Sequence, residues 1–273
     1  MRLLRAAFLI ALALGLVGCQ SFPNPGGGGD SVQLAKILDR GELRVGMSGS
    51  QPPLNMSDTR GQIIGLEVDI MKTLADSMGL ELKYVTMPFA ELLPALEQGS
   101  VDLVISGMTI TPERNARVAF AGPYFISGKS VLTKSETIAR VTETTTLDDP
   151  NRTYAALAGS TSEEFVREVL PKAKLVLTED YDTAVAMVIN DEVEAMVADF
   201  PICKISVLRN PDAGLSTLAT PFTIEPLGIA LPADDPLFLN LVENYLNTLE
   251  GTGLLTAFKA KWFSDGSWLN ELP

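Results

Sequence analysis

The chain alternates short apolar runs typical of strands with longer runs of helical periodicity, and it does so in two separate blocks. The strand patterns of the first block are LRVGM (43–47), LKYV (82–85) and VDLVI (101–105), and its helical patterns cover 67–78 and 90–98. The second block has strand patterns YAALA (154–158), KLVLT (174–178) and VEAMVA (193–198), and helical patterns over 162–169 and 182–189. Alternation of this kind predicts an α/β fold.

The two blocks also correspond to one another in pattern. The segment LEQGSVDLVISG (96–107) can be laid over VINDEVEAMVAD (188–199), with a helix end, a polar turn and a strand in the same order. Residues 107 and 199 are therefore expected at equivalent carboxyl ends of strands in two separate sheets, where open α/β folds hold ligands. We expect two lobes with a cleft between them.

Composition supports two ordinary cores and excludes several classes of function. The 273 residues are 46% hydrophobic and 20% charged, which is typical of a globular chain. The formal net charge of −13 disfavours nucleic-acid binding, which needs a basic surface. With no histidine and two cysteines, the chain has no Ser-His or Cys-His catalytic arrangement and no common zinc site, and we expect neither metal nor cofactor.

The first thirty residues have the features of an export signal followed by a tether. Arg2 and Arg5 precede the apolar run 6–17, which is short of the roughly 20 residues that span a bilayer as a helix. The sequence LVGC, ending in Cys19, resembles a bacterial lipobox, which implies lipidation of that cysteine; the alternative is an ordinary signal peptide with a chance cysteine. We predict a signal peptide over 1–18 and a lipidated, glycine-rich tether over 19–31.

The segment SGMTITPER (106–114) follows directly on the strand pattern VDLVI. Thr111 and Pro112 have the positions of an N-cap and a first helical residue, so the loop ends at a helix start, which suits an anion. Arg114 adds a planar fork that can meet a carboxylate through two parallel hydrogen bonds. Taken alone, an arginine in a first helical turn is also typical of a solvated surface.

Several segments resemble the amino-acid-binding family of bacterial solute-binding proteins, extracellular solute-binding protein family 3. They lie in the family's order over about 40–264 and comprise GELRVGMSGSQPPLN, GLEVDI, LLPALEQGSVDLVISGMTITPERNARVAFAGPYFISG, AMVADFP and KWF. The resemblance implies the type II periplasmic-binding-protein fold: two lobes, each a mixed sheet flanked by helices, joined by two hinge strands. We expect the first lobe over 32–130 and 228–273, the second over 133–222, and hinges at 130–133 and 223–227.

The resemblance also implies roles for the residues that would hold the ligand's backbone. Arg114 would bind the α-carboxylate with help from Thr109, the Gly107 carbonyl would face the α-ammonium, and Asp199 would pair with it. A zwitterion taken out of water needs such paired charges. The alternative for Asp199 is a helix N-cap.

Ser160 and Thr161 match a second-lobe loop that supplies further donors to the carboxylate in relatives. Thr161 and Glu164 also satisfy a capping box, and both roles can hold together.

The side-chain part of the site is expected from Phe89, Ser48 and Gln51. Phe89 lies where relatives place an aromatic ring over the ligand, although burial in the core is an equal alternative. Ser48 and Gln51 stand where relatives often carry an acidic residue and a second aromatic ring. Their presence disfavours a cationic ligand and favours a small or neutral polar amino acid.

The resemblance thus implies a lipid-anchored binding protein on the periplasmic or extracytoplasmic face of a membrane. It would capture a free L-amino acid by hinge closure and deliver it to the permease of an ABC importer, acting as a monomer and not as an enzyme. One alternative is an enzyme on the same fold, similar to cyclohexadienyl dehydratase, which would need a general acid in the cleft. Another is a ligand sensor.

Overall fold

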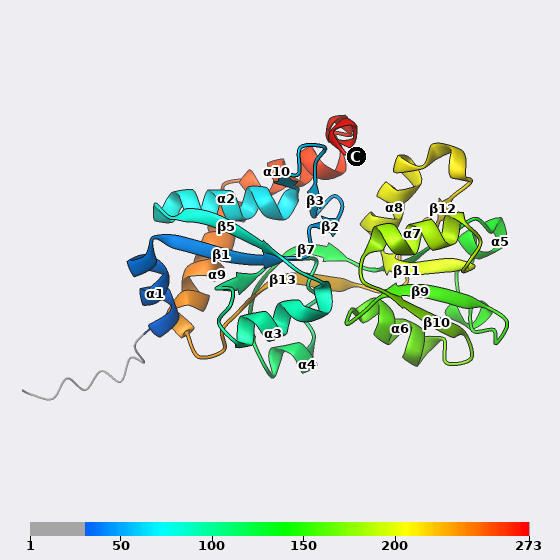
Figure 1. The fold of residues 1–273 in the computed structure, drawn as a ribbon, viewed down its shortest axis with the longest axis horizontal. Coiled ribbons are helices and arrows are strands. Elements are labelled where there is room, and N and C mark those ends of the chain that lie inside the picture. Colours follow the sequence, from blue (N-terminus) through cyan, green and yellow to red (C-terminus); the bar gives the residue numbers. More distant parts are fainter. Residues whose placement is uncertain (1–30, 273) are drawn as a thin grey trace, which may run out of the picture. The chain divides into compact units, whose positions relative to one another are not determined.

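Two five-stranded sheets carry the fold of residues 31–272, the part of the chain that the computed structural model describes (Figure 1). The first sheet has the order β5-β1-β6-β13-β7, with bounds Glu81–Thr86, Glu42–Met47, Leu103–Val104, Glu225–Leu231 and Ala119–Ser127. The second has the order β10-β9-β11-β8-β12, with bounds Lys174–Thr178, Thr153–Leu157, Ala195–Asp199, Lys129–Thr133 and Ser216–Thr217. A small third sheet contains β2 (Ser50–Gln51), β3 (Asn55–Ser57) and β4 (Ile63–Ile64).

Both large sheets are mixed in the same way. In the first, β5, β1 and β6 are parallel, while β13 runs antiparallel to β6 and β7. In the second, β10, β9 and β11 are parallel, while β8 runs antiparallel to β11 and β12. The predicted α/β fold with two mixed sheets is confirmed. Strands β6 and β11 both stand third in their sheets. Gly107 follows β6 and Asp199 ends β11, so the two residues lie at the carboxyl ends of equivalent strands.

Helices connect and flank the strands (Figure 1). The α-helices are α1 (Val32–Arg40), α2 (Leu66–Met78), α3 (Leu92–Glu97), α4 (Pro112–Asn115), α5 (Glu136–Ala139), α6 (Thr161–Val169), α7 (Tyr181–Ile189), α8 (Phe200–Arg209), α9 (Pro236–Gly251) and α10 (Leu254–Phe263). Short 3₁₀ turns are η1 (Phe89–Glu91), η2 (Thr144–Thr146), η3 (Pro211–Ala213) and η4 (Ser267–Glu271). Apolar side chains at helical spacing, such as Ile70 and Leu74 in α2 and Val242 in α9, are buried in one core cluster with β1.

The sequence patterns predicted these elements closely, with one notable difference. The pattern 174–178 coincides with β10, and α2, α6 and α7 each begin one residue before their predicted starts. Of the strand predicted over 101–105, only Leu103–Val104 form a strand, β6. The residues on either side still bond to β1, since Asp102 N donates to Arg44 O and Ile105 N donates to Gly46 O.

The chain passes between the two large sheets at two neighbouring places. One crossing is Gly128, between β7 and β8, and the other covers 218–224, between β12 and β13. A Cβ on Gly128 would lie 2.0 Å from the Thr223 carbonyl oxygen, so only glycine lets the crossings pack this closely. The residues 130–133, predicted as hinge, lie inside β8 and pair with β11 and β12. The lobe and hinge boundaries stay predictions.

Asp235 joins the beginning of the described chain to α9. Its carboxylate accepts the Phe238 N–H at 2.9 Å as the N-cap of α9. The same carboxylate accepts the Ser31 hydroxyl at 2.5 Å and the Gln33 and Leu34 N–H groups at 3.0 and 2.9 Å. One side chain therefore caps two helices.

The predicted signal peptide (1–18), Cys19 and all of the predicted tether except Ser31 lie outside the described residues. Within 31–272, every helix is too short or too polar to cross a membrane.

Candidate functional site

The loop after β6 presents Thr109 and Arg114 as the sequence predicted. Thr111 has extended backbone angles and its hydroxyl accepts the Arg114 N–H at 3.2 Å, while Pro112 is the first residue of α4. Thr111 is therefore the N-cap, as expected. Gly107 begins the loop with a φ of +58°, a conformation that glycine adopts without strain.

Arg114 is buried and lacks an anionic partner in the part of the chain that the structure describes. Its side chain donates from Nη1 to the Thr109 carbonyl at 3.0 Å and from Nη2 to the Gly159 carbonyl at 3.1 Å. The residue is only 7% exposed, and no described carboxylate lies within 4.0 Å of its guanidinium. Burial lowers the pKa of Arg114, opposed by the more distant Glu164 and Glu225 carboxylates. A buried cation of this kind favours the approach of an anion.

Phe89 lies beside this guanidinium. It is 5% exposed in η1, and the centre of its ring is 5.7 Å from the Arg114 Cζ. The ring also packs in a core cluster with Leu92 and Met108. Phe89 is therefore a core residue whose ring also lies beside the candidate site, where it contacts Arg114 through a cation–π interaction. This position is consistent with both interpretations, a ring near the ligand and a ring buried in the core.

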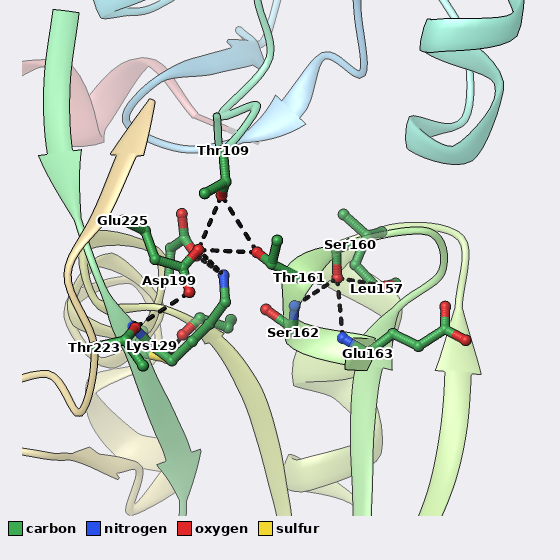
Figure 2. Close-up of polar contacts among 12 residues, drawn as sticks. Thr109, Lys129, Leu157, Ser160, Thr161, Ser162, Glu163, Asp199, Thr223 and Glu225 are labelled. Atoms are coloured by element: carbon green, nitrogen blue, oxygen red, sulfur yellow. Dashed lines mark hydrogen bonds and ion pairs between the residues drawn. The ribbon is translucent and has the colours of Figure 1, made fainter. Parts of the chain in front are cut away.

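Asp199 does not cap α8 with its side chain. It stands at the N-cap position of that helix, but its carboxylate makes no capping hydrogen bond. Instead the Nζ of Lys129, which pairs with Asp199 across β8 and β11, lies 2.5 Å from Asp199 Oδ1 (Figure 2). Lys129 is 2% exposed. Its burial would lower its pKa, but Asp199 and Glu225 outweigh that effect and raise it.

Glu225, the first residue of β13, completes this cluster (Figure 2). Its Oε2 lies 2.9 Å from Lys129 Nζ and accepts the hydroxyls of Thr109 and Thr161, both at 2.9 Å. Its Oε1 accepts the Thr223 hydroxyl at 3.1 Å. Burial would raise the pKa of Glu225, but Lys129 and the hydroxyl donors lower it.

Lys129 and Glu225 were missed at the sequence level. Lys129 opens the otherwise apolar strand KSVLT, and Glu225 opens the strand EPLGIAL. A charge at the start of a strand is ordinary in itself, and nothing in the spacing indicates that the two meet. The available signal was their position at the predicted hinges, since Lys129 directly precedes 130–133 and Glu225 lies within 223–227.

The loop before α6 differs by one residue from the predicted capping box. Ser160, not Thr161, is the N-cap: its hydroxyl accepts the Ser162 and Glu163 N–H groups at 3.2 and 3.3 Å. Glu163, not Glu164, accepts the Gly159 N–H, at 2.8 Å. The reason is that α6 begins one residue earlier than its pattern indicated. Thr161 is thereby left with its hydroxyl directed at Glu225 (Figure 2).

Ser48 and Gln51 occupy different surroundings. Ser48 lines a surface hollow of about 460 Å³ that Asp180 and Asp182 of the second block also line. Gln51 is 2% exposed, and its Oε1 lies so near Gly107 that a Cβ there would approach it to 2.5 Å. Gln51 therefore packs against the Gly107 loop, whereas Ser48 shares a hollow with two aspartates that the sequence did not place near it.

A buried carboxyl group behind the loop was also missed. Glu67 Oε1 accepts the Gly107 N–H at 2.6 Å and the Tyr124 hydroxyl, and Oε2 accepts the Asn55 amide at 2.5 Å. Burial raises the pKa of Glu67. Its first-turn position in α2 resembles that of any solvated helix residue, so no local pattern indicated this role in holding Gly107.

Metal and thiol chemistry find no support among residues 31–272. No group of three or more Cys, Asp and Glu side chains there is arranged to hold a metal ion. Cys203 is fully buried like a small apolar residue, and burial raises its pKa to about 12.

The family model for bacterial extracellular solute-binding proteins, family 3, matches residues 43–265. This chain belongs to that family. Among curated relatives of the solute-binding protein, ABC transporter arginine-binding protein 1 of Escherichia coli is 27% identical over 81% of this chain and 90% of the relative. The cyclohexadienyl dehydratase of Pseudomonas aeruginosa is also 27% identical, over 84% and 85%.

A solved structure extends the likeness from sequence to fold. The binding component of an ABC transporter from Wolinella succinogenes, complexed with lysine, is 35% identical to this solute-binding protein. The match covers 85% of this chain and 99% of the Wolinella succinogenes chain, with a TM-score of 0.79.

Proposed function

We propose that this solute-binding protein captures a free L-amino acid with a small or neutral polar side chain. The observation that carries the proposal is the separation of charge around Thr109. On one side, the Arg114 guanidinium bonds to the Thr109 carbonyl without a described carboxylate partner. On the other, the Thr109 hydroxyl bonds to Glu225, in a cluster of two carboxylates and one ammonium. A zwitterion complements both sides, because its carboxylate meets the guanidinium and its ammonium meets the excess negative charge.

In the proposed site, Arg114 and Thr109 bind the α-carboxylate, and Asp199 and the Gly107 carbonyl bind the α-ammonium. Ser160 and Thr161 support the carboxylate from the second lobe, while Phe89, Ser48 and Gln51 surround the side chain. The hydroxyls of Thr109 and Thr161 both donate to Glu225 in this structure, so their donation to a ligand requires them to rotate. The names of the relatives, which include an arginine-binding protein and a lysine complex, support an amino-acid ligand.

We further propose that the lobes close on the ligand about the two crossings and that the closed monomer meets the permease of an ABC importer. Lipidation of Cys19 would hold the protein at the outer face of a membrane, in the periplasm or an equivalent space. Support for this part comes from the signal-like sequence before Cys19 and from the family's extracellular solute-binding character.

The decisive experiment is a thermal-shift panel of the twenty common amino acids with the soluble protein. A ligand at 100 times its Kd stabilises the folded state by about 2.7 kcal/mol, which raises the midpoint of unfolding by several degrees. We expect uncharged amino acids to give the largest shifts. A panel without any shift, with calorimetry likewise showing no heat of binding, would refute amino-acid capture.

A second candidate function is catalysis on the same fold. One relative is named cyclohexadienyl dehydratase, and such chemistry needs a protonated general acid. Asp199, the acid expected in the cleft, instead forms an ion pair with Lys129, which uses the carboxylate form. We therefore expect no turnover of prephenate or arogenate, and steady production of the aromatic product would overturn that expectation.

A further inference from the structure

Four charged side chains line the candidate site, and we call them the charged quartet: Arg114, Lys129, Asp199 and Glu225. None is more than 8% exposed. Two are cations and two are carboxylates, so the quartet has no net charge. Because the quartet is buried and poorly solvated, a net charge that a ligand brings there costs far more free energy than the same charge at the surface.

Four other carboxyl groups lie nearby but do not alter this balance. Asp180 and Asp182, which line the hollow beside Ser48, are half-buried and exposed, so water and salt screen them. Glu67 stands behind Gly107, and both of its oxygens already accept hydrogen bonds from Gly107, Tyr124 and Asn55, so it is compensated by its own donors and does not contact the quartet. Glu164 faces Arg114 from α6 but is exposed, so water and salt screen it. The quartet is therefore the buried charge that a ligand meets.

We propose that Lys129 and Glu225 determine which side-chain charge the site accepts, and that their mutual balance restricts it to amino acids with uncharged side chains. This inference rests on the proposed function. An amino acid with an uncharged side chain is a zwitterion without net charge, so the net charge of the quartet and the ligand together stays at zero. A lysine or arginine ligand buries one extra positive charge, and glutamate or aspartate buries one extra negative charge.

The positions of the two residues give each a separate effect. Lys129 Nζ touches both Asp199 and Glu225, so it is a built-in ammonium group that occupies carboxylates which a cationic ligand would need. Glu225 touches Lys129 and the hydroxyls of Thr109 and Thr161, so it supplies a second carboxylate beside Asp199 and brings the charge of the quartet to zero. Removing the positive charge of Lys129 shifts the preference toward ligands with positive side chains, and removing the negative charge of Glu225 shifts it toward ligands with negative side chains.

The test repeats the amino-acid panel on Lys129→Met, Glu225→Gln and the double variant. Methionine and glutamine keep the length of the side chains they replace, so the change is mainly one of charge. In K129M the site has one excess negative charge, and lysine and arginine rise in the ranking. In E225Q it has one excess positive charge, and aspartate and glutamate rise. The double variant has its balance restored and prefers uncharged ligands again.

Calorimetry gives the size of the effect with two isosteric pairs. The ratio of glutamate to glutamine affinity is expected to rise at least about tenfold in E225Q, which equals about 1.4 kcal/mol. The ratio of 2,4-diaminobutyrate to homoserine affinity is expected to rise similarly in K129M. Lys134→Met is the matched control, because Lys134 is a partly exposed lysine that pairs with Asp191 outside the site.

The outcomes separate this inference from the proposed function. If no amino acid binds the wild-type protein, both fail together. If uncharged amino acids bind but neither single variant changes the order of charged and uncharged ligands, the charge inference alone fails. K129M leaves two carboxylates without their cation and is the variant more at risk of misfolding. E225Q keeps the Lys129–Asp199 pair and decides the question by itself if K129M does not fold.

Discussion

Arg114 and Arg117 stand three residues apart, and their surroundings give them different roles. Arg117 is exposed and donates from Nε and Nη2 to both oxygens of Glu97, a surface pair of the kind that contributes little to stability. Arg114 is buried and bonds only to carbonyl groups among the described residues. The solvated surface role that the sequence left open for Arg114 is the one that Arg117 has, and burial separates the two residues.

Replacing Arg114 by alanine is therefore expected to abolish useful affinity, with a loss of about 2–5 kcal/mol, because the ligand carboxylate would be buried without a partner. Isothermal titration of the best amino acid from the panel measures this loss. Arg117→Ala is the matched control and is expected to bind normally. Equal affinities of R114A and the wild-type protein would show that the assigned site is wrong.

The arrangement around the start of α4 could be predicted from the sequence because Thr109, Thr111 and Arg114 lie within six residues, where local rules of capping apply. Lys129, Glu225 and Glu67 could not. Lys129 meets Asp199 from 70 positions away, and only the pairing of β8 with β11 brings them together. Contacts of this kind follow from tertiary structure and leave no local pattern.

The loop at the start of helix α6 both caps the helix and contacts residues of the candidate site. Ser160 caps it, Gly159 accepts a hydrogen bond from Arg114, and Thr161 contacts Glu225. Helical periodicity predicted the body of this helix, since apolar spacing is set by 3.6 residues per turn. The start was predicted one residue too late, because Ser160 and Thr161 have the same capping chemistry and only the backbone angles distinguish them.

Removing the cap, in Ser160→Ala, is expected to destabilise the protein by about 1 kcal/mol and to weaken ligand binding as well, because the loop that holds Gly159 and Thr161 loses its anchor. Denaturant unfolding and calorimetry measure the two effects. Ser135 caps α5 in the same way, accepting the Ile138 N–H, but lies away from the quartet. In Ser135→Ala we expect the loss of stability alone; equal loss of affinity in both variants would contradict a special role for the α6 loop.

At the scale of the whole molecule, Glu225 links the two sheets. It belongs to β13 of the first sheet, while its partners Lys129 and Thr161 belong to β8 and α6 around the second. Its carboxylate contributes to stability in its charged form, because its pKa in the folded protein lies below the ordinary value of 4.5. This contribution is complete above 4.5 and is lost as the pH falls through the folded pKa.

We accordingly expect the difference in stability between wild type and E225Q to shrink as the pH is lowered from about 7 to about 3. Urea unfolding at a series of pH values measures this difference. Glu250→Gln removes an exposed carboxylate of α9 and serves as the control, with a small difference throughout. A gap between wild type and E225Q that stays constant over the whole range would be inconsistent with the assigned ion cluster.

The double cap formed by Asp235 has a mechanical consequence. Any pull on the chain ahead of Ser31 enters the folded part where one carboxylate holds Ser31, Gln33 and Leu34 to the start of α9. The load passes into α1, α9 and the first sheet, and the crossings at Gly128 and 218–224 lie further along the chain. In the proposed lipid-anchored form, tension on the tether would therefore load the first sheet and leave the two crossings unloaded, so that the proposed closure of the lobes could proceed while the molecule is held.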